Sequence, residues 1–368
     1  MISLTKIWEY GRQRWANWRR QPTKPEPAPA SSEPFVAPVF TRAANDAGSL
    51  VQEFLAVGRY ALLLRPQIIE NLEDDQIRKT IDALDAQMAL SPVGDVVLGQ
   101  PIEDCDDFDT DGTAVATVQS RVVHVESIFL DRYAVTNCQY KHFVDGGGYE
   151  EMGIWEEDVW AAMLDFVDQT GHPGPHYWHN GTFPRGQADH PVVGVSWYEA
   201  TAYARWCGKR LPRDAEWTKA ACWPVTISPG NLQQRKFPWG EIMENDRANL
   251  WSAGINSTVP TDEFEKGISV GGLLQMVGNV WEWMSGPYGT PDDVSLALPV
   301  PMKSIRGGAF DTYFDNQATC HFQSGENPLH RKHNIGFRLV LGICDLAPRA
   351  AELIYGGSTE PITVATEV

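Results

Sequence analysis

Side chains able to bind a hard cation occur in residues 271–283, where two amides and a carboxylate stand beside three glycines and two tryptophans. The glycines permit backbone geometry that a Cβ atom would forbid. Asn279 and Glu282 each offer an oxygen to Ca²⁺, an ion that prefers carboxylate and carbonyl ligands. The alternative is that both side chains hydrogen-bond an irregular loop. The stretch therefore predicts either a structural Ca²⁺ site or a loop-stabilising network.

A second stretch, residues 311–333, mixes aromatic, amide, hydroxyl and histidine side chains and shows little periodicity. Such a mixture is typical of an exposed recognition surface, because aromatic rings provide contact area and short polar groups provide hydrogen bonds. We predict that this surface binds a protein or a small-molecule ligand. The alternative is that the segment only closes the fold. The side chains expected to contact the ligand are Tyr313, Phe314, His321, Phe322, His330 and Arg331.

Strand and helix signals surround both stretches. In residues 281–283 two tryptophans alternate with a glutamate, which fits an extended strand with the indoles on one face. A Gln or Glu three residues after Thr136 and after Ser196 has capping-box spacing, so a helix is expected to begin at each. A further helix follows Arg213, a weak capping residue, and the carboxylate of Asp214 is expected to cap it instead.

The stretch Met-Val-Gly-Asn-Val-Trp-Glu-Trp, residues 276–283, resembles the signature of the formylglycine-generating enzymes, also called sulfatase-modifying factors. Further motifs occur in the family's order and extend the resemblance over roughly residues 93–343. The resemblance implies an α+β domain with a C-type-lectin-like fold and little regular secondary structure. The other matching motifs are Tyr133–Tyr140, Asp189–Ala200, Arg210–Trp217, Phe237–Gly240, Arg306–Gly308 and Asn334–Arg338.

The enzymes of this family hold copper(I) with two cysteines, five residues apart, and activate oxygen on a substrate cysteine. Counting back from the motif at 336–338, Cys320 takes the second of these positions and Asp315 takes the first. A linear copper(I) site needs two soft thiolates, and one carboxylate cannot replace a thiolate there. We therefore expect no copper site and a buried, structural role for Cys320.

The resemblance thus carries over the scaffold without its chemistry, because one fold hosts many functions. We predict a non-catalytic ligand- or protein-binding module. The segment ending at Asn334–Arg338 also resembles the variable region of proteins diversified by retroelements, which use this fold. The alternative function is that of an oxygen-dependent oxidoreductase acting on a cysteine or thiol substrate, with Cys320 as its candidate catalytic residue.

The composition narrows the classes of partner and compartment. A formal net charge of −18 argues against general nucleic-acid binding. Six cysteines occur without a Cys-x-x-Cys pair, and four histidines between residues 172 and 190 follow no metal-ligand spacing. The acidic run at 104–111 matches only the first half of a calcium-loop pattern, so a solvated loop is expected. With no apolar run of spanning length and no signal peptide, a cytoplasmic protein is expected.

Five segments are expected along the chain. Residues 1–21 form a basic amphipathic helix with a tryptophan-rich face, suited to a membrane surface or a partner protein. Residues 22–46 are a proline-rich linker, and residues 47–90 are a helical hairpin, with one helix expected over 47–64 and a second over about 70–90. Residues 91–345 form the lectin-like domain, and residues 346–368 form a C-terminal tail.

Overall fold

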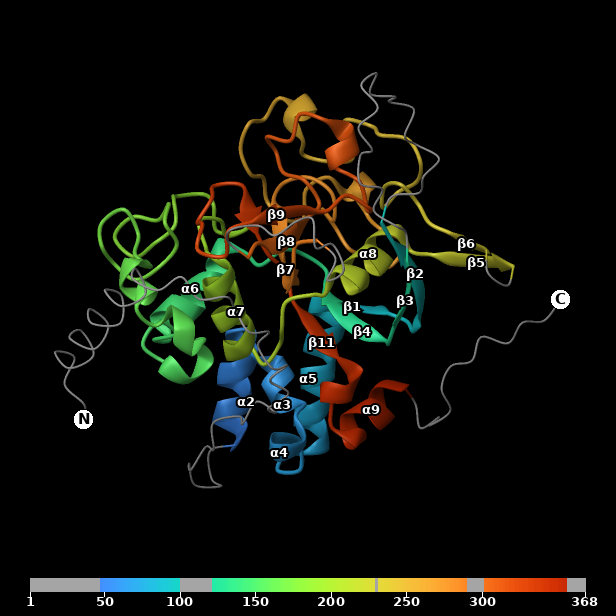
Figure 1. The fold of residues 1–368 in the computed structure, drawn as a ribbon. Coiled ribbons are helices and arrows are strands. Elements are labelled where there is room, and N and C mark those ends of the chain that lie inside the picture. Colours follow the sequence, from blue (N-terminus) through green and yellow to red (C-terminus); the bar gives the residue numbers. More distant parts are fainter. Residues whose placement is uncertain (1–46, 100–120, 229–230, 290–300, 356–368) are drawn as a thin grey trace, which may run out of the picture.

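The computed structural model describes residues 47–99, 121–228, 231–289 and 301–355. The predicted basic helix, the proline-rich linker, the acidic run and the end of the predicted tail lie outside these residues. Within them, long irregular segments separate short strands and helices, which confirms the predicted α+β class with little regular secondary structure. Figure 1 shows two small sheets near the middle of the molecule, with helices beside and below them.

The first sheet joins segments from both ends of the described chain. Its order is β1 (Met88–Ser91), β4 (Ile128–Asp131) and β11 (Val340–Gly342), with β4 antiparallel to both neighbours. Successive side chains of a strand point to opposite faces, and β4 uses both. On one face, Phe129 packs in a core shared with residues 51–88 and 341–350. On the opposite face, Leu130 packs in a second core. This central strand is therefore buried along its whole length.

The second sheet contains the signature stretch. Its order is β10 (Ile335–Gly336), β7 (Trp281–Pro287), β8 (Lys303–Arg306) and β9 (Ser324–Glu326). The β10–β7 pair is parallel, and the β7–β8 and β8–β9 pairs are antiparallel. The predicted strand at 281–283 is confirmed as the start of β7.

Two helices begin where the capping boxes predict. α6 (Asn137–Asp145) and α7 (Trp197–Trp206) each start with a complete box, in which Gln139 and Glu199 accept from the backbone N–H of the capping residue. Both helices pack into an aromatic core, where buried rings contact one another edge-on or stacked. The rings and indoles of this core are Tyr140, Phe143, Trp155, Phe166, Trp178, Trp197, Tyr203, Trp206, Trp283 and Phe337.

The third helix of the domain, α8 (Asp214–Cys222), differs from the prediction in its first turn. The backbone N–H of Arg213 donates to the carboxylate of Glu216 at 2.7 Å. Asp214 is the first helical residue and directs its carboxylate to Arg306 on β8, at 2.6 Å. The expected cap by Asp214 is therefore wrong, because a buried cation on a neighbouring strand takes this carboxylate.

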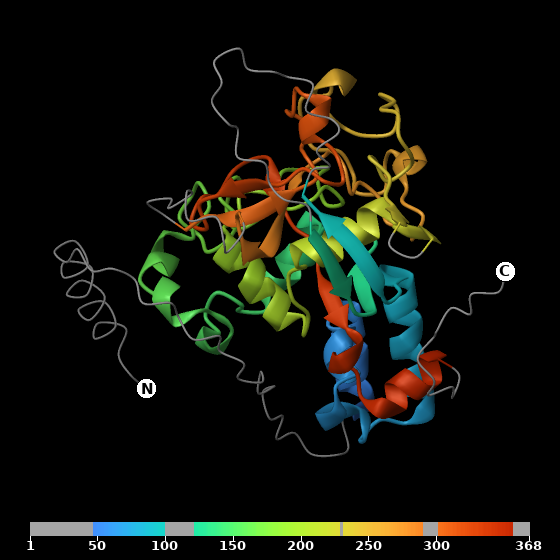
Figure 2. The same ribbon diagram turned by 45° about the vertical axis from the view of Figure 1, so that its right-hand side comes forward.

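A helical layer covers the other face of the first sheet. Figures 1 and 2 show its members together at the bottom of the molecule, next to β11. Their apolar side chains share one core with residues of β1, β4 and β11. The helices are α2 (Ala47–Ala56), α3 (Tyr60–Leu63), α4 (Pro66–Ile69), α5 (Asp74–Gln87) and α9 (Pro348–Tyr355).

The helical layer is more divided than the sequence suggests. Apolar periodicity predicts one helix over 47–64, but the structure has two, separated at Gly58, whose φ of +76° does not fit a helix. The second predicted helix, 70–90, ends at Gln87, and the chain runs directly into β1. The start of the predicted tail also joins this layer, since the backbone N–H of Ala347 donates to the carbonyl of Leu64 at 2.9 Å.

The remaining elements are short and lie mostly at the surface. Two ribbons pair β2 (Gly94–Leu98) with β3 (Arg121–Val125), and β5 (Val225–Ser228) with β6 (Asn231–Gln233). In the described ranges, none of the helices is both long and apolar enough to cross a bilayer. The described 3-10 helices are Met152–Ile154, Glu157–Val159, Ala162–Asp165, Trp251–Ala253, Glu265–Gly267, Asp315–Gln317 and Ile343–Asp345.

Candidate functional site

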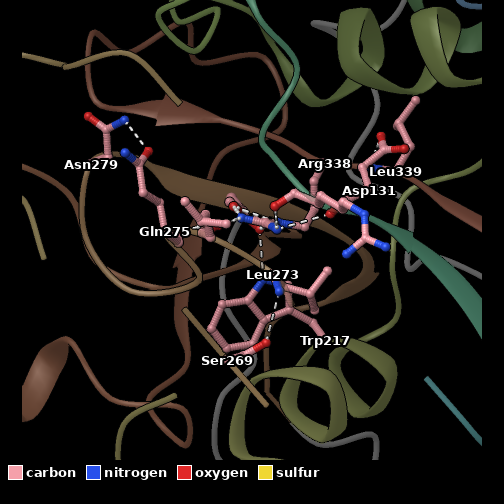
Figure 3. Close-up of polar contacts among 11 residues, drawn as sticks. Asp131, Trp217, Ser269, Leu273, Gln275, Asn279, Arg338 and Leu339 are labelled. Atoms are coloured by element: carbon pink, nitrogen blue, oxygen red, sulfur yellow. Dashed lines mark hydrogen bonds and ion pairs between the residues drawn. The ribbon is translucent and has the colours of Figure 1, made fainter. Parts of the chain in front are cut away.

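Glu282 forms a buried ion pair with Arg338 in the centre of the domain. The Nε of Arg338 lies 2.9 and 2.8 Å from the two carboxylate oxygens, and its Nη2 lies 2.7 Å from Oε1. Trp217 on α8 donates its indole N–H to Oε2 at 2.7 Å. The other guanidinium N–H groups donate to backbone carbonyls at residues 131–132 and 274–275, as Figure 3 shows around Arg338. The pair therefore joins α8, β7 and β4.

The amide of Asn279 makes four hydrogen bonds, to three other residues. Its oxygen accepts from Asn249 Nδ2 at 3.1 Å and from the Val259 N–H at 3.0 Å. Its nitrogen donates to the Val259 carbonyl at 3.1 Å and to Gln275 Oε1 at 2.6 Å, the latter contact visible in Figure 3. Asn279 adopts a left-handed φ of +67°. A Cβ atom on the preceding residue, Gly278, would lie 2.8 Å from the Asn249 carbonyl oxygen.

The predicted Ca²⁺ ligands thus belong to a loop-stabilising network, the alternative that the sequence left open. A cation at Glu282 would have to displace the guanidinium of Arg338, and one at Asn279 would have to displace two backbone or amide donors. No group of three or more His, Cys, Asp or Glu side chains suited to a metal occurs in the described ranges.

Cys320 and Asp315 do not face a common open site. The thiol of Cys320 is fully buried in the core that also contains Cys222. Burial raises the pKa of the Cys320 thiol well above its usual range, and the neighbouring Cys222 raises it further. Asp315 is exposed at the start of a 3-10 helix. A thiolate is therefore disfavoured at Cys320 in the folded chain.

A polar network holds the segment that follows Cys320. Asp214 accepts from Arg306 Nε at 2.6 Å and from Gln323 Nε2 at 3.0 Å. Arg306 in turn donates to the carbonyls of His321 and Phe322 at 3.3 and 3.4 Å. This network fixes the backbone of the predicted recognition segment on β8 and α8. It explains why Asp214 is not free to cap its own helix.

His321 and Phe322 lie partly buried within that fixed segment. The ring of His321 contacts the Arg235 carbonyl through Nε2 at 3.1 Å, and burial lowers the pKa of this histidine. Phe322 packs against Trp281 with ring centroids 6.1 Å apart. Both side chains therefore contribute part of their surface to the fold and part to solvent.

Tyr313 and Phe314 lie in an exposed group of three rings. Trp251 packs against Tyr313 with centroids 4.7 Å apart and planes at 59°, and Tyr313 contacts Phe314 edge-on at 5.0 Å. Trp251, Tyr313 and Phe314 are 50%, 61% and 58% exposed, which is high for rings already in mutual contact. We call these three residues the aromatic surface. A backbone hydrogen bond joins its two segments, since the Trp251 backbone N–H donates to the Thr312 carbonyl at 3.3 Å.

The last two predicted residues differ from each other. His330 is exposed and its Nδ1 lies 2.7 Å from Glu326 Oε1. Arg331 is mostly buried and pairs with Glu199 of α7 at 2.9 Å. Its guanidinium also donates to the carbonyls of Asp165 and Val167 at 3.3 and 2.9 Å, and to that of Gly174. Arg331 thus ties α7 to the loop at 165–174, and little of its side chain remains for a ligand.

The loop held by Arg331 contains a buried carboxylate, Asp168. Burial alone would raise its pKa, but hydrogen bonds from Gly181, Thr170 and His172 outweigh burial and lower the pKa of Asp168 to about 2. The Oδ2 atom accepts from the Gly181 N–H at 2.7 Å, and Oδ1 accepts from the Thr170 N–H at 2.7 Å. The carboxylate therefore closes the loop as a charged group.

Sequence reasoning missed Trp251, the third member of the aromatic surface. It stands in an irregular stretch between a buried Leu250 and Gly254, without periodicity that would mark it. Its only sequence signal is a large aromatic residue beside a turn glycine, which is common in loops. The fold alone brings it to Tyr313.

A model of the sulfatase-modifying factor enzyme 1-like domain matches residues 78–343, which is well over half of the chain. The chain belongs to this family. The match begins within α5 and ends after β11, so both sheets and the aromatic surface lie inside the sulfatase-modifying-factor-like domain. The predicted C-type-lectin-like fold of the formylglycine-generating-enzyme type is thereby confirmed.

Relatives of this domain include enzymes with two different names. The hercynine oxygenase of Mycobacterium tuberculosis is 35% identical over 177 residues, which are 46% of this chain and 40% of the relative. The formylglycine-generating enzyme of Bos taurus is 30% identical over 268 residues, with coverages of 62% and 68%. The chain spans only 39% to 52% of the length of three hercynine oxygenases that it matches.

Solved structures with a related arrangement include CarF and a variable protein. CarF has a TM-score of 0.46 at 19% identity, covering 70% of this chain and 98% of its own. Treponema denticola variable protein 1 has a TM-score of 0.45 at 16% identity, covering 69% and 94%. These values describe a distant likeness in fold and no more.

Proposed function

We propose that this sulfatase-modifying-factor-like domain is a non-catalytic module that binds a ligand or a protein through its aromatic surface. The observation that carries the proposal is the exposure of Trp251, Tyr313 and Phe314, which remain half or more open to solvent while in mutual contact. Large rigid rings supply most of the binding free energy in many interfaces, because they lose little conformational entropy on binding.

The backbone next to the aromatic surface is held in a fixed conformation, which suits a recognition site. Thr312, which precedes Tyr313 in the chain, is buried and accepts from the Ala309 N–H through Oγ1 at 2.9 Å. Gly307 and Gly308 precede this turn with φ values of +101° and +76°, so the chain is set by backbone geometry that few residues adopt. A binding surface on a rigid support loses less entropy when its ligand binds.

An oxygen-dependent oxidoreductase acting on a cysteine or thiol is the second candidate. The names of the hercynine oxygenase and formylglycine-generating enzyme relatives favour it. The burial of Cys320, the raised pKa of its thiol and the exposed carboxylate at Asp315 favour the binding module instead.

The binding proposal is tested with the full chain on an array of peptides and glycans. Replacing Trp251, Tyr313 and Phe314 together by alanine is expected to lower every specific signal by at least about tenfold. The fold should persist, since exposed substitutions usually change the free energy of unfolding by about 0.5 kcal/mol or less each. The matched control is Trp160→Ala with Leu164→Ala, two exposed apolar residues outside this surface.

Two outcomes would overturn the proposal. One is a triple variant that binds the same array members as the wild type with the same strength. The other is a triple variant that unfolds, because the three rings would then serve the core. A control variant that retains the wild-type profile is the expected result.

A further inference from the structure

The aromatic surface has the chemistry of a site for a cationic partner. The faces of tryptophan and tyrosine rings attract ammonium and guanidinium groups. Asp315 directly follows Phe314 in the sequence, is exposed, and makes no side-chain hydrogen bond or ion pair within the described ranges. Asp311 lies on the other side of Thr312, where its carboxylate contacts His333 at 3.5 Å and Asn334 at 3.0 Å.

The two carboxylates also exclude some partners. An anionic membrane surface or a nucleic-acid backbone would be repelled by Asp311 and Asp315. A neutral aliphatic partner would gain contact with the rings of Tyr313 and Phe314 but would partly desolvate the nearby carboxylates without pairing them. The surface therefore favours a peptide that combines positive charge with aromatic side chains.

This chain contains such a peptide in its own residues 1–21. The segment has five basic residues and one acidic residue, in a chain whose net charge is −18. Its sequence also has three tryptophans, which suit stacking on exposed rings. The basic residues are Lys6, Arg12, Arg14, Arg19 and Arg20, and the tryptophans are Trp8, Trp15 and Trp18.

The length of the intervening chain permits this contact. Residues 22–46 comprise 25 residues with six prolines in the first eighteen, and such a linker spans about 80 Å when extended. A globular body of this size is roughly 50 Å across. The segment can therefore reach the aromatic surface from the start of α2 at Ala47, at a high effective concentration.

We propose that residues 1–21 bind the aromatic surface of their own chain and compete there with the external ligand. This inference rests on the proposed function in using the same surface. The guanidinium and ammonium groups of the segment lie over the rings of Trp251, Tyr313 and Phe314 and pair with Asp315. The external ligand class that follows is a basic, aromatic-containing peptide, since it must displace a segment of that kind.

The experiment uses the full chain and a zero-length carbodiimide cross-linker, which joins a lysine amine to a carboxylate in direct contact. Lys6 is the only lysine of residues 1–21, so its cross-linked peptides report the position of the segment. We expect a Lys6–Asp315 cross-link within single chains. It should fall at least about fivefold in the Trp251→Ala, Tyr313→Ala, Phe314→Ala variant. The Trp160→Ala, Leu164→Ala control should retain it.

Each other outcome overturns the inference. Lys6 cross-linked to many carboxylates, with equal yield in the triple variant, would show that the rings do not hold the segment. A cross-link found only between isotopically distinct copies would make the occupant a second chain. Recruitment of the full chain to anionic vesicles, together with no Lys6–Asp315 cross-link when vesicles are absent, would make it a membrane segment. Loss of array binding without any Lys6–Asp315 cross-link sinks this inference alone and leaves the proposed function standing.

Discussion

The signature residues of this chain act through their hydrogen-bond partners. Glu282 and Asn279 are recognisable in the sequence as oxygen-bearing side chains, but their partners stand in other motifs or in no motif. Spacing along the chain cannot reveal that Arg338 reaches Glu282, because the two residues meet only through the parallel pairing of β10 with β7. The sequence therefore predicted important polar residues and left open whether they bind a cation or the protein.

Replacing Arg338 by methionine tests the role of this ion pair. The variant leaves the Glu282 carboxylate buried without its cation, so the free energy of unfolding should fall by about 3–5 kcal/mol. Urea unfolding followed by tryptophan fluorescence measures this loss. Combining Arg338→Met with Glu282→Gln should restore part of it, because the buried charge is then absent. A loss below about 1 kcal/mol in the single variant would contradict a structural role.

The lowered pKa of Asp168 predicts that the free energy of unfolding depends on pH with a definite sign. Its folded pKa of about 2 lies below the ordinary value of 3.8, so its stabilising effect is present above about pH 4. That effect is lost as the pH falls from about 4 towards 2, where the folded carboxylate also binds a proton. Asp168→Asn should lower the free energy of unfolding by about 2 kcal/mol at pH 7 and by little near pH 2.

Urea unfolding at several pH values measures the difference between Asp168→Asn and the wild type. Asp165→Asn serves as a control, since Asp165 is exposed on the same loop. An equal loss for Asp168→Asn at pH 7 and at pH 2 would show that shape, and not charge, holds the loop.

At the scale of elements, local signals predicted helix starts better than helix lengths. The capping boxes at Thr136 and Ser196 are complete within four residues, so the sequence alone specifies them. The break at Gly58 depends on packing beyond the local sequence, because a single glycine is tolerated in many helices. The helical layer also takes α9 from the opposite end of the chain, a pairing that no local pattern contains.

Two leucines, one directly before α9 and one within it, test how the C-terminal end of the described chain packs in the core. Leu346 is 6% exposed within the helical layer, whereas Leu353 is 48% exposed. Leu346→Ala should cost about 2–4 kcal/mol of unfolding free energy by removing buried methyl groups. Leu353→Ala should change it by about 0.5 kcal/mol or less. Equal effects in a thermal or urea unfolding measurement would mean that this segment does not pack as described.

For the whole molecule, the sequence predicted the scaffold and two of the three rings of the aromatic surface. The family motifs mark the core and the turns, which is why the fold follows from them. Tyr313 and Phe314 were predicted as exposed recognition residues and are exposed, but their partner Trp251 comes from a separate loop. Arg331 was predicted beside them, yet its guanidinium lies against Glu199. A binding surface is assembled from segments that are distant in the sequence. A sequence pattern describes one segment at a time and does not reveal which segments meet.

The distinction between a binding module and an enzyme concerns the whole molecule, and oxygen consumption tests it most directly. The full chain is supplied with copper(I) and a cysteine-containing peptide, and oxygen uptake is compared between the wild type and Cys320→Ser. We predict that both proteins stay at the background rate of copper and peptide alone, because an exposed carboxylate stands where a second thiolate is expected and burial disfavours the Cys320 thiolate. Oxygen uptake by the wild type that disappears in Cys320→Ser would contradict a non-catalytic binding module.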